Sequence, residues 1–302
     1  MKVVLTGGTG FIGRHLVDAL TARGDECVIV SRSGTDPWRR AAVRVVRGDP
    51  KEAGNWQREL DGADAVVNLA GELIVDPPKR WTAARKARLR ASRIEATRRV
   101  VEAIGRAASP PRVVLSGSAV GYYGARGDDV VDESAPPGGD FLARLVVDWE
   151  AAAQPASVAC RVVYLRTAPV LGLGGGALRP MLPIFKLGLG GPWGSGEQWW
   201  SWIHIADEVG LMLHLLDHDV HGPVNLTAPH PVTVNDFAKA LGDVLHRPAI
   251  LHVPAFAMRL ALGEAATAML DLQRVVPTRA LESGYAFMFP RVGEALEEVV
   301  NG

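Results

Sequence analysis

The chain opens on the stretch Val3-Val4-Leu5-Thr6-Gly7-Gly8-Thr9-Gly10-Phe11-Ile12-Gly13, which decides its fold. A short β-branched run leads into glycines spaced G-x-x-G-x-x-G, and a helical pattern continues to Arg23. Gly7 allows a positive φ, Gly10 keeps a Cβ out of the path of a phosphate, and Gly13 lets the helix pack closely on the strand. The start of that helix presents free N–H groups and the positive end of its dipole. This strand–turn–helix context predicts a dinucleotide site.

The first two thirds of the chain repeat the same alternation of strand and helix. Further β-branched runs occur at Cys27–Ser31, Arg44–Arg47, Ala65–Leu69, Arg112–Ser116 and Arg161–Leu165. These runs are continuously apolar, as strands buried on both faces must be. Helical patterns such as residues 81–108 lie between them. The alternation predicts an α/β fold with a Rossmann-type, doubly wound parallel sheet.

The composition changes after Val170. Residues 171–200 are rich in Gly, Pro and Trp, which suggests loops and short turns over a pocket. Later patterns predict a helix at Trp202–Asp219, a strand at Pro223–Thr227 and helices at Val234–Leu245 and Ala255–Leu270. We therefore expect a dinucleotide-binding domain at 1–170, completed by about 200–228. A smaller C-terminal α/β substrate lobe with a lid is expected at 171–199 and 229–302.

The end of the second predicted strand indicates which dinucleotide is bound. A carboxylate at this place would hydrogen-bond the 2′-hydroxyl of NAD. The chain has Ser31-Arg32-Ser33 instead. A guanidinium with flanking hydroxyls suits a 2′-phosphate, so NADP(H) is the predicted cofactor, and a solvated arginine is the alternative.

Composition excludes several classes of partner. The 302 residues carry 33 basic and 33 acidic side chains, which gives no reason to expect nucleic acid or an anionic membrane as partner. No apolar stretch approaches the length of a membrane span. The two cysteines, Cys27 and Cys160, lie in apolar runs and suggest no disulfide framework, so a reducing, cytoplasmic location is expected. His214, His218 and His221 do not complete a metal pattern, and no metal is predicted.

Further motifs carry a resemblance to known proteins. Gly48-Asp49 and Asn68–Gly71 resemble the extended short-chain dehydrogenase/reductase superfamily. Within it, the chain is similar to the epimerase-family (nucleoside-diphosphate-sugar epimerase-like) subgroup, which has a DUF1731-like C-terminal segment. The motifs of that subgroup are Ser118–Gly124, Asp140–Ala143, Trp149-Glu150, Trp202–Asp207, Arg247-Pro248, Leu262–Glu264 and Gly284–Phe287.

The resemblance implies an activity, a partner and a set of cofactor contacts. It implies an oxidoreductase or epimerase acting on a small hydroxyl- or carbonyl-bearing substrate, with a sugar nucleotide as the family default. Relatives often pair through helices near 81–107 and 141–153, which favours a homodimer. The implied cofactor-binding residues are Gly7, Thr9, Gly10, Phe11, Ile12 and Gly13 at the pyrophosphate, Ser31 and Arg32 at the 2′-phosphate, Asp49 at the adenine, and Leu69, Ala70, Gly71, Glu72, Ser116, Arg166 and Val170 toward the nicotinamide.

The catalytic signature of the family is missing. Active members carry Tyr-x-x-x-Lys on the helix after the fifth strand, where the tyrosine exchanges the substrate proton. The corresponding helix, Phe141–Ala153, contains neither residue, and Leu142 and Val146 occupy the two positions. The usual serine falls on Ala119. The remaining candidates for proton transfer are Tyr122, Tyr123, Ser118 and Glu72.

Two classes of function therefore stay open. The first is an NADP-dependent oxidoreductase or epimerase, and the second is a non-catalytic NADP(H)-binding sensor or scaffold. The missing signature favours the second class, whereas the intact glycine loop favours the first. The tryptophans between 193 and 202 lie beside glycines and suggest either a mobile lid or packing between lobes.

Overall fold

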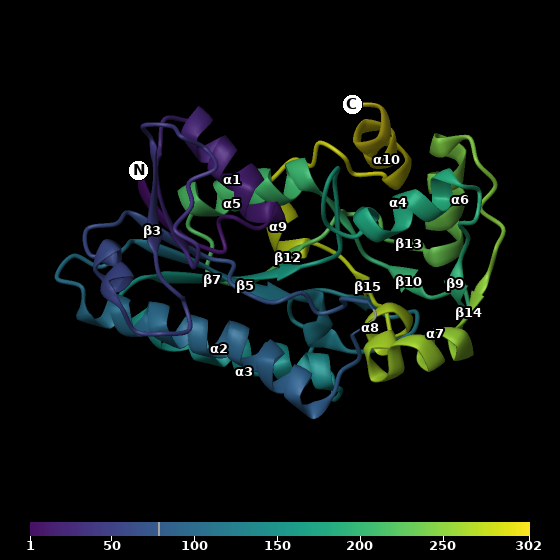
Figure 1. The fold of residues 1–302 in the computed structure, drawn as a ribbon, viewed down its shortest axis with the longest axis horizontal. Coiled ribbons are helices and arrows are strands. Elements are labelled where there is room, and N and C mark those ends of the chain that lie inside the picture. The colour runs from purple at the N-terminus through teal and green to yellow at the C-terminus, as the bar shows by residue number, and fades with distance from the viewer. Residues whose placement is uncertain (78) are drawn as a thin grey trace.

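A seven-stranded parallel sheet forms the centre of the molecule (Figure 1). The computed structural model describes residues 1–77 and 79–302. The strand order is β12-β7-β5-β4-β1-β2-β3. Strands β2 and β3 therefore extend the sheet on one side of β1, and β4, β5, β7 and β12 extend it on the other. The strands are β1 (Lys2–Thr6), β2 (Glu26–Ser31), β3 (Val43–Arg47), β4 (Ala65–Asn68), β5 (Val113–Ala119), β7 (Arg161–Thr167) and β12 (Gly222–Leu226). The predicted Rossmann-type, doubly wound sheet is confirmed.

Helices cover both faces of the sheet. Helices α1 (Phe11–Ala22) and α5 (Ile205–Asp217) lie on one face, and α2 (Ala83–Arg106) and α3 (Phe141–Ala153) lie side by side on the other (Figure 1). Successive residues of a strand point to opposite faces. Val3 and Leu5 accordingly join the core beneath α1 and α5, and Val4 joins the core beneath α2 and α3. This double burial explains why the strands are continuously apolar.

Side-chain caps fix where the two lower helices begin. The Thr82 hydroxyl accepts a hydrogen bond from the Arg85 N–H at the start of α2, at 3.2 Å. The Asp140 carboxylate accepts one from the Ala143 N–H at the start of α3, at 2.8 Å. Each such cap contributes about 1 kcal/mol. Short 3-10 turns lie beside these helices at η1 (Asn55–Leu60), η2 (Val120–Tyr123) and η3 (Gln154–Val158).

A second core, rich in aromatic side chains, lies beyond the end of the sheet. It is built by α4 (Leu178–Lys186), α6 (Val234–Leu245), α7 (Ala255–Leu262), η4 (Gly263–Ala266), α8 (Thr267–Leu270) and α10 (Val292–Asn301) (Figure 1). Four short strand pairs connect the segments: β8 (Val170–Leu171) with β11 (Ile203–His204), β9 (Trp193–Gly194) with β14 (Val253–Pro254), β10 (Trp199–Trp200) with β13 (Val232–Thr233), and β6 (Val130–Val131) with β15 (Arg274–Val275). The last short helix, α9 (Thr278–Glu282), returns to the sheet, where Ala280 joins the core beneath α5.

Three details of the expected secondary structure were wrong. Residues 171–200 contain helix α4, whose apolar face of Leu178, Leu182 and Phe185 is hidden in the sequence among prolines and glycines. Helix α5 begins at Ile205 rather than at Trp202, because Ile203 and His204 pair with β8. The helix expected at Ala255–Leu270 is interrupted at Gly263, which has a φ of +60°.

Three of the four tryptophans of residues 193–202 form part of the second core rather than a mobile lid, whereas Trp199 is half-buried and donates to Asp128 Oδ1 at 2.9 Å. Trp193, Trp200 and Trp202 are only 6%, 4% and 0% exposed. The rings of Trp193 and Trp200 pack edge-on against Phe237, at centroid distances of 6.2 and 4.0 Å. These three side chains therefore pack within the second core, whereas a mobile lid or packing between lobes was expected.

Candidate active site

Close packing at the glycine loop ties the end of β1 to the end of β4. Gly7 has a φ of +73°, as predicted, and a Cβ on it would lie 2.6 Å from the carbonyl carbon of Leu69. A Cβ on Gly13 would lie 2.4 Å from the Gly7 oxygen, so α1 approaches the loop as closely as predicted. The nearest atom to a Cβ on Gly10 would be that same oxygen, at 3.1 Å. The chain therefore leaves one side of the loop open at Gly10.

The start of α1 suits an anion. Gly10 caps the helix without any side-chain hydrogen bond, and the first turn contains no acidic residue. The N–H groups of this turn therefore have no side-chain acceptor, and the helix dipole adds a positive potential. These residues fit the pyrophosphate of a dinucleotide.

A second glycine segment, which the sequence analysis assigned only to loops, packs against Phe11. A Cβ on Gly175 would lie 2.1 Å from Phe11 Cδ2, and one on Gly172 would lie 2.7 Å from Phe11 Cζ. The ring of the first helical residue therefore needs glycine on the facing segment. The repeated glycines at 172–176 were the available signal, but their partner could not be known from the sequence.

Polar side chains gather where β2 and β3 end. The hydroxyls of Ser31 and Ser33 are 3.2 Å apart, and the Arg32 side chain is exposed. Asp49, which follows β3, accepts a hydrogen bond from the Lys51 N–H at 3.0 Å. Ser31, Arg32 and Asp49 thus lie at the carboxyl edge of the sheet, beside the glycine loop.

A buried hydrogen-bond chain joins the end of β4 to the two lower helices. The Thr6 hydroxyl donates to Asn68 Oδ1 at 2.6 Å, and Asn68 Nδ2 donates to Thr97 Oγ1 at 2.8 Å. Trp149 Nε1 donates to the same Thr97 oxygen at 2.9 Å. A Cβ on Gly117 would lie 2.7 Å from Trp149, so α3 is held tightly against β5. Sequence reasoning did not identify Thr97, because nothing in its local pattern indicates this partner.

Glu72 is held by arginines from α2. Its carboxylate forms an ion pair with Arg85, and its side chain is 37% exposed. Arg93 donates to the Glu72 carbonyl oxygen at 2.8 Å, and burial lowers the pKa of Arg93 to about 10. Glu72 follows Gly71, where the nicotinamide is expected, and its charge is already compensated by Arg85.

A bidentate ion pair between Arg166 and Glu150 lies at the ends of β5 and β7. The two nitrogen–oxygen distances are both 2.9 Å, and Ser118 Oγ donates to Glu150 Oε1 at 2.6 Å. Glu150, known from the sequence only as part of a subgroup motif, holds both Ser118 and Arg166 in place. The Ser118 hydroxyl proton is therefore already used in a hydrogen bond to a carboxylate.

The two adjacent tyrosines have different environments. Tyr123 is 0% exposed, and its hydroxyl donates to Asn225 Oδ1 at 2.7 Å and accepts from Arg166 Nη1 at 3.0 Å. Burial raises the pKa of Tyr123 to about 12. This position is structural, because no substrate can reach the hydroxyl. Tyr122 is half-buried, and in the described part of the chain its hydroxyl has no protein partner.

The two positions of the missing signature lie in apolar packing. Val146 is 3% exposed and belongs to the buried face of α3. Leu142 is partly buried, and its Cβ lies 3.5 Å from where Gly121 would carry one. The helix is therefore built without a polar side chain at either position.

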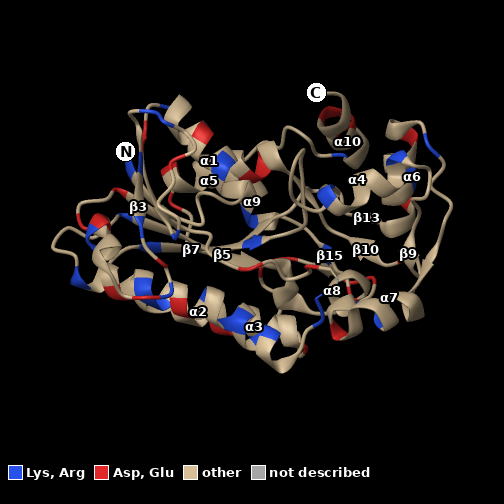
Figure 2. Ribbon diagram, viewed as in Figure 1, with Lys and Arg blue, Asp and Glu red and all other residues tan. Residues whose placement is uncertain are grey.

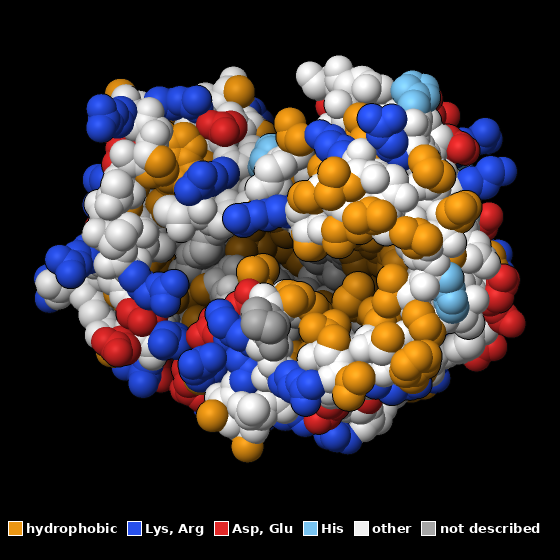
Figure 3. Space-filling model, turned by 45° about the vertical axis from the view of Figure 1, so that its right-hand side comes forward, with side chains coloured by type: hydrophobic (Ala, Val, Ile, Leu, Met, Phe, Trp, Pro, Cys, Tyr) orange, Lys and Arg blue, Asp and Glu red, His pale blue; other side chains and the backbone are white. Residues whose placement is uncertain are grey.

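The surroundings of the site differ in charge from one lobe to the other. Figure 3 shows a hollow on this face of the molecule, with hydrophobic side chains gathered on the side of the second core and more Lys and Arg on the other side. The basic run of α2 is visible in Figure 2. Its ion pairs with carboxylates are Arg85–Glu72, Lys86–Glu264, Arg90–Asp148, Arg98–Glu95, Arg99–Glu102 and Arg106–Glu102. These cations have carboxylate partners, although the side chains of Arg90 and Arg98 are also exposed to solvent.

Other titratable side chains have structural roles. His204 caps α5 through Nδ1, and its Nε2 lies 2.8 Å from Glu298 of α10. His214 stacks on His218 at a centroid distance of 3.7 Å. Within residues 1–77 and 79–302, no group of three or more His, Cys, Asp or Glu side chains is arranged to hold a metal ion. None of the helices described in this structure has the length and apolar character needed to span a membrane.

Comparisons with known proteins cover the whole chain. Residues 3–227 match the model of the NAD dependent epimerase/dehydratase family, and residues 253–299 match a domain of unknown function, DUF1731. The chain is 41% identical to "Epimerase family protein SDR39U1 homolog, chloroplastic" of Arabidopsis thaliana, over 100% of this chain and 87% of the relative.

Solved structures show the same similarity. The crystal structure of human epimerase family protein SDR39U1 (isoform 2) with NADPH has a TM-score of 0.90 and 39% identity, covering 100% of this chain and 99% of the other. The structure of UDP-glucuronic acid 4-epimerase from Bacillus cereus, solved with UDP-glucuronic acid and NAD, has a TM-score of 0.82 and 17% identity, covering 100% and 98%. At that identity the second likeness establishes the fold alone.

Proposed function

The chain belongs to the NAD-dependent epimerase/dehydratase family, and from that premise we propose that it is an NADP(H)-dependent oxidoreductase or epimerase-type enzyme acting on a small hydroxyl or carbonyl compound. The resemblance drawn from the sequence motifs is confirmed by the match to both family models.

The observation that carries the proposal is the open glycine loop joined to an exposed arginine. The uncapped start of α1 lies open at Gly10, and Arg32 follows the end of β2. Gly7, Thr9, Gly10, Phe11, Ile12 and Gly13 would hold the pyrophosphate, and Arg32 with Ser31 would hold the 2′-phosphate. The human relative crystallised with NADPH, 39% identical over the whole chain, supports this choice of cofactor.

Tyr122 is the proposed proton-transfer residue. The cofactor, when bound, supplies or accepts a hydride. A hydroxyl without a protein partner can hydrogen-bond the oxygen of a substrate, and Tyr122 has such a hydroxyl among the residues described. Arg166, anchored by Glu150, holds the ring in place from one face. Ser118 already donates to Glu150, and Glu72 is already ion-paired with Arg85, so both are weaker candidates for proton transfer than Tyr122.

The experiment that tests the proposal follows NADPH oxidation by the purified chain across a panel of aldehydes, ketones and sugar nucleotides. Turnover of at least one compound supports an enzyme. Tight NADPH binding without turnover across the panel would contradict the proposed activity and favour a sensor or scaffold. The observation that favours this second candidate is the apolar packing of Leu142 and Val146 at the signature positions.

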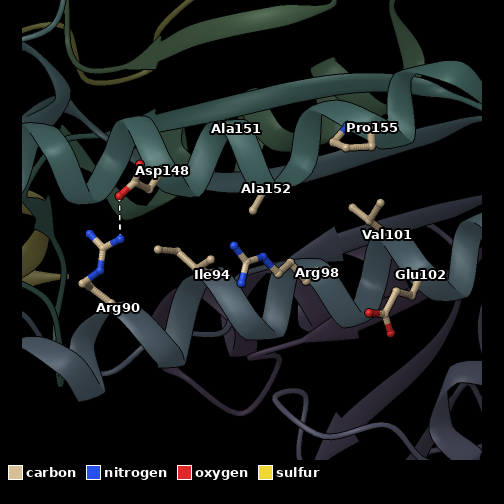
Figure 4. Close-up of a pocket in the computed structure, with 9 residues that line it drawn as sticks. All are labelled: Arg90, Ile94, Arg98, Val101, Glu102, Asp148, Ala151, Ala152 and Pro155. Carbon is tan, nitrogen blue, oxygen red and sulfur yellow. Dashed lines mark hydrogen bonds and ion pairs between the residues drawn. The ribbon is translucent and has the colours of Figure 1, made fainter.

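A homodimer through α2 and α3 is the second part of the proposal. A groove of about 430 Å³ runs between these helices, and Figure 4 shows charged side chains along it interspersed with the apolar Ile94, Val101, Ala152 and Pro155. Arg90 and Arg98 lie along it together with Glu102 and Asp148, so one surface carries both charge signs. A two-fold contact requires such self-complementarity, because the same patch serves both subunits.

Light scattering during gel filtration tests the dimer. The expected mass is twice the 32.3 kDa of the chain. Ala152→Arg places a long charged side chain in the groove and is expected to give a monomer, whereas Ala159→Arg, on an exposed position after η3, is expected to stay dimeric. A dimer that persists in Ala152→Arg would contradict this interface.

A further inference from the structure

The ends of β2 and β3 bring an arginine beside the serines of the proposed 2′-phosphate site. Ser31 pairs with Arg47 in the parallel register, and the Gly48 N–H donates to the Ser31 carbonyl oxygen at 3.0 Å. Because side chains alternate along a strand, Arg47 lies on the same face of β3 as Val43 and Val45, which pack beneath α1. Ser31 is on the corresponding face of β2. Both residues therefore lie on the α1 side of the sheet, where the glycine loop begins.

The stem of Arg47 lies across the turn that follows β2. The turn is closed by a hydrogen bond from the Gly34 N–H to the Ser31 carbonyl oxygen at 3.3 Å. Gly34 has a φ of +67°, and a Cβ on it would lie 3.1, 3.4 and 3.6 Å from Cβ, Cγ and Cδ of Arg47. Glycine at this position therefore leaves room for the arginine stem. Arg47 and Arg32 consequently belong to the same turn region as Ser31 and Ser33, one from β3 and one from within the turn.

The charges at this turn are uncompensated. Arg32 and Arg47 are both exposed, and in the part of the chain that the structure describes neither has a carboxylate partner. Neighbouring arginines differ: Arg40 is paired with Asp18 at 2.8 Å, and Arg44 is paired with Glu59. Two guanidinium groups at one turn repel each other unless an anion lies between them. A phosphate monoester, with its three acceptor oxygens, meets that requirement.

We propose that Arg47 is a second guanidinium of the 2′-phosphate site and a determinant of the preference for NADP(H) over NAD(H). The proposal rests on the proposed binding of NADP(H) and adds a residue that the end of β2 alone does not reveal. In this arrangement Arg32 and Arg47 contact the phosphate from two sides, and the Ser31 and Ser33 hydroxyls donate to it between them. Neither arginine touches the reacting atoms, so Arg47 acts on affinity and selectivity only.

The test measures the dissociation constants of NADPH and NADH by titration calorimetry for the wild-type chain, Arg47→Gln and Arg44→Gln. Arg44 lies on the opposite face of the same strand and is ion-paired, so it controls for the loss of a positive charge from β3. Arg47→Gln is expected to weaken NADPH binding by roughly tenfold or more and to change NADH binding by less than about twofold. Arg44→Gln is expected to leave both constants unchanged.

Retained NADH binding shows that the variant is folded. If NADPH binds tightly to the wild-type chain and Arg47→Gln leaves the ratio of the two constants unchanged, the role of Arg47 is overturned while the proposed function stands. If the wild-type chain binds neither cofactor, the proposed function itself fails. Arg47→Lys gives a further check, because a point charge without the planar fork is expected to restore only part of the affinity.

Discussion

The guanidinium carbon of Arg166 lies 3.5 Å from the centroid of the Tyr122 ring. Such a cation–π contact contributes about 0.5–2 kcal/mol and fixes the orientation of the ring. Glu150 anchors the arginine through two hydrogen bonds of 2.9 Å, so strand β7, helix α3 and turn η2 meet at one tyrosine. The phenol is thereby held at the carboxyl ends of β5 and β7, where ligands of open α/β sheets bind.

Tyr122→Phe is expected to lower kcat at least tenfold, which corresponds to about 1.4 kcal/mol of transition-state stabilisation, because only the hydroxyl is removed. The NADPH dissociation constant should stay unchanged, since the ring and its contact with Arg166 are retained. Steady-state kinetics with any compound that the chain reduces would check the first expectation, and calorimetry the second. An unchanged kcat would remove Tyr122 from the mechanism.

Tyr123→Phe should act on stability instead. It leaves Asn225 Oδ1 and one Arg166 N–H without their partner in a fully buried place. An unsatisfied buried polar group costs about 1–3 kcal/mol, so the free energy of unfolding should fall by that amount in urea titrations. A variant as stable as the wild-type chain but catalytically impaired would reverse the roles given to the two tyrosines.

Substitutions in the glycine loop should separate binding from folding. Gly13→Ala is expected to destabilise the fold by about 1–3 kcal/mol, because its Cβ would lie 2.4 Å from the Gly7 oxygen. Gly10→Ala should fold nearly normally but bind NADPH more weakly, because its Cβ points to the open side of the loop. As a control, Gly105→Ala in α2 meets no atom within 4 Å and should stabilise the helix by roughly 0.5–1 kcal/mol. Thermal unfolding and calorimetry of the three variants measure both properties.

The buried carboxyl of Glu208 should make stability depend on pH. It is fully buried in α5, where Oε1 accepts a hydrogen bond from Thr167 at 2.9 Å and Oε2 has no partner among the described residues. Burial raises its pKa from 4.5 to about 8. Between these values the folded chain holds a proton that the unfolded chain releases, so stability falls as pH rises, by at most about 1.4 kcal/mol per pH unit.

Glu208→Gln tests this dependence, because glutamine is neutral throughout and close in shape. The free energy of unfolding of the variant should increase relative to that of the wild-type chain as the pH rises from 5 to 8. The difference between the two should level off at higher pH. Parallel pH profiles for the two proteins would show that Glu208 titrates at its ordinary pKa.

Restoring half of the missing family signature should damage the fold. Val146→Lys would bury an ammonium group on a face of α3 that packs against the sheet, at a cost of several kcal/mol. Leu142→Tyr, at a partly exposed position, should be tolerated within about 1 kcal/mol. Urea unfolding of both variants measures this difference. A much lower stability of Val146→Lys would show that the core around α3 no longer accepts the lysine of Tyr-x-x-x-Lys, and equal stability of the two variants would contradict this.

The parts of the fold that the sequence predicted are those governed by local rules. The run from Val3 to Gly13 carries strand, turn and helix signals in adjacent residues, and its strand β1 lies inside the sheet between β4 and β2. Helix α4 was missed because Pro180 and Pro183 contradict a helical pattern that tertiary burial of Leu182 and Phe185 overrides. For the tryptophans the sequence left a lid and packing both open, because composition alone does not distinguish a core from a lid.

The same distinction between local and long-range signals applies to the residues of the site. The glycine loop could be predicted because the spacing of its glycines indicates a turn, a close approach and a helix start within one short stretch of sequence. Glu150, Thr97 and Arg47 were not identified as site residues, because each acquires its role through a partner far along the chain: Arg166, Asn68 and Gly34. Tyr122 and Tyr123 are neighbours with the same chemistry, and only their burial separates them.

The measurement that tests the central claim most directly is a paired titration of the purified chain with NADPH and NADH at one salt concentration. Recognition of a 2′-phosphate by Arg32 and its neighbours predicts that NADPH binds at least tenfold more tightly, a difference of about 1.4 kcal/mol. Equal affinity for the two cofactors, or binding of neither, would contradict it.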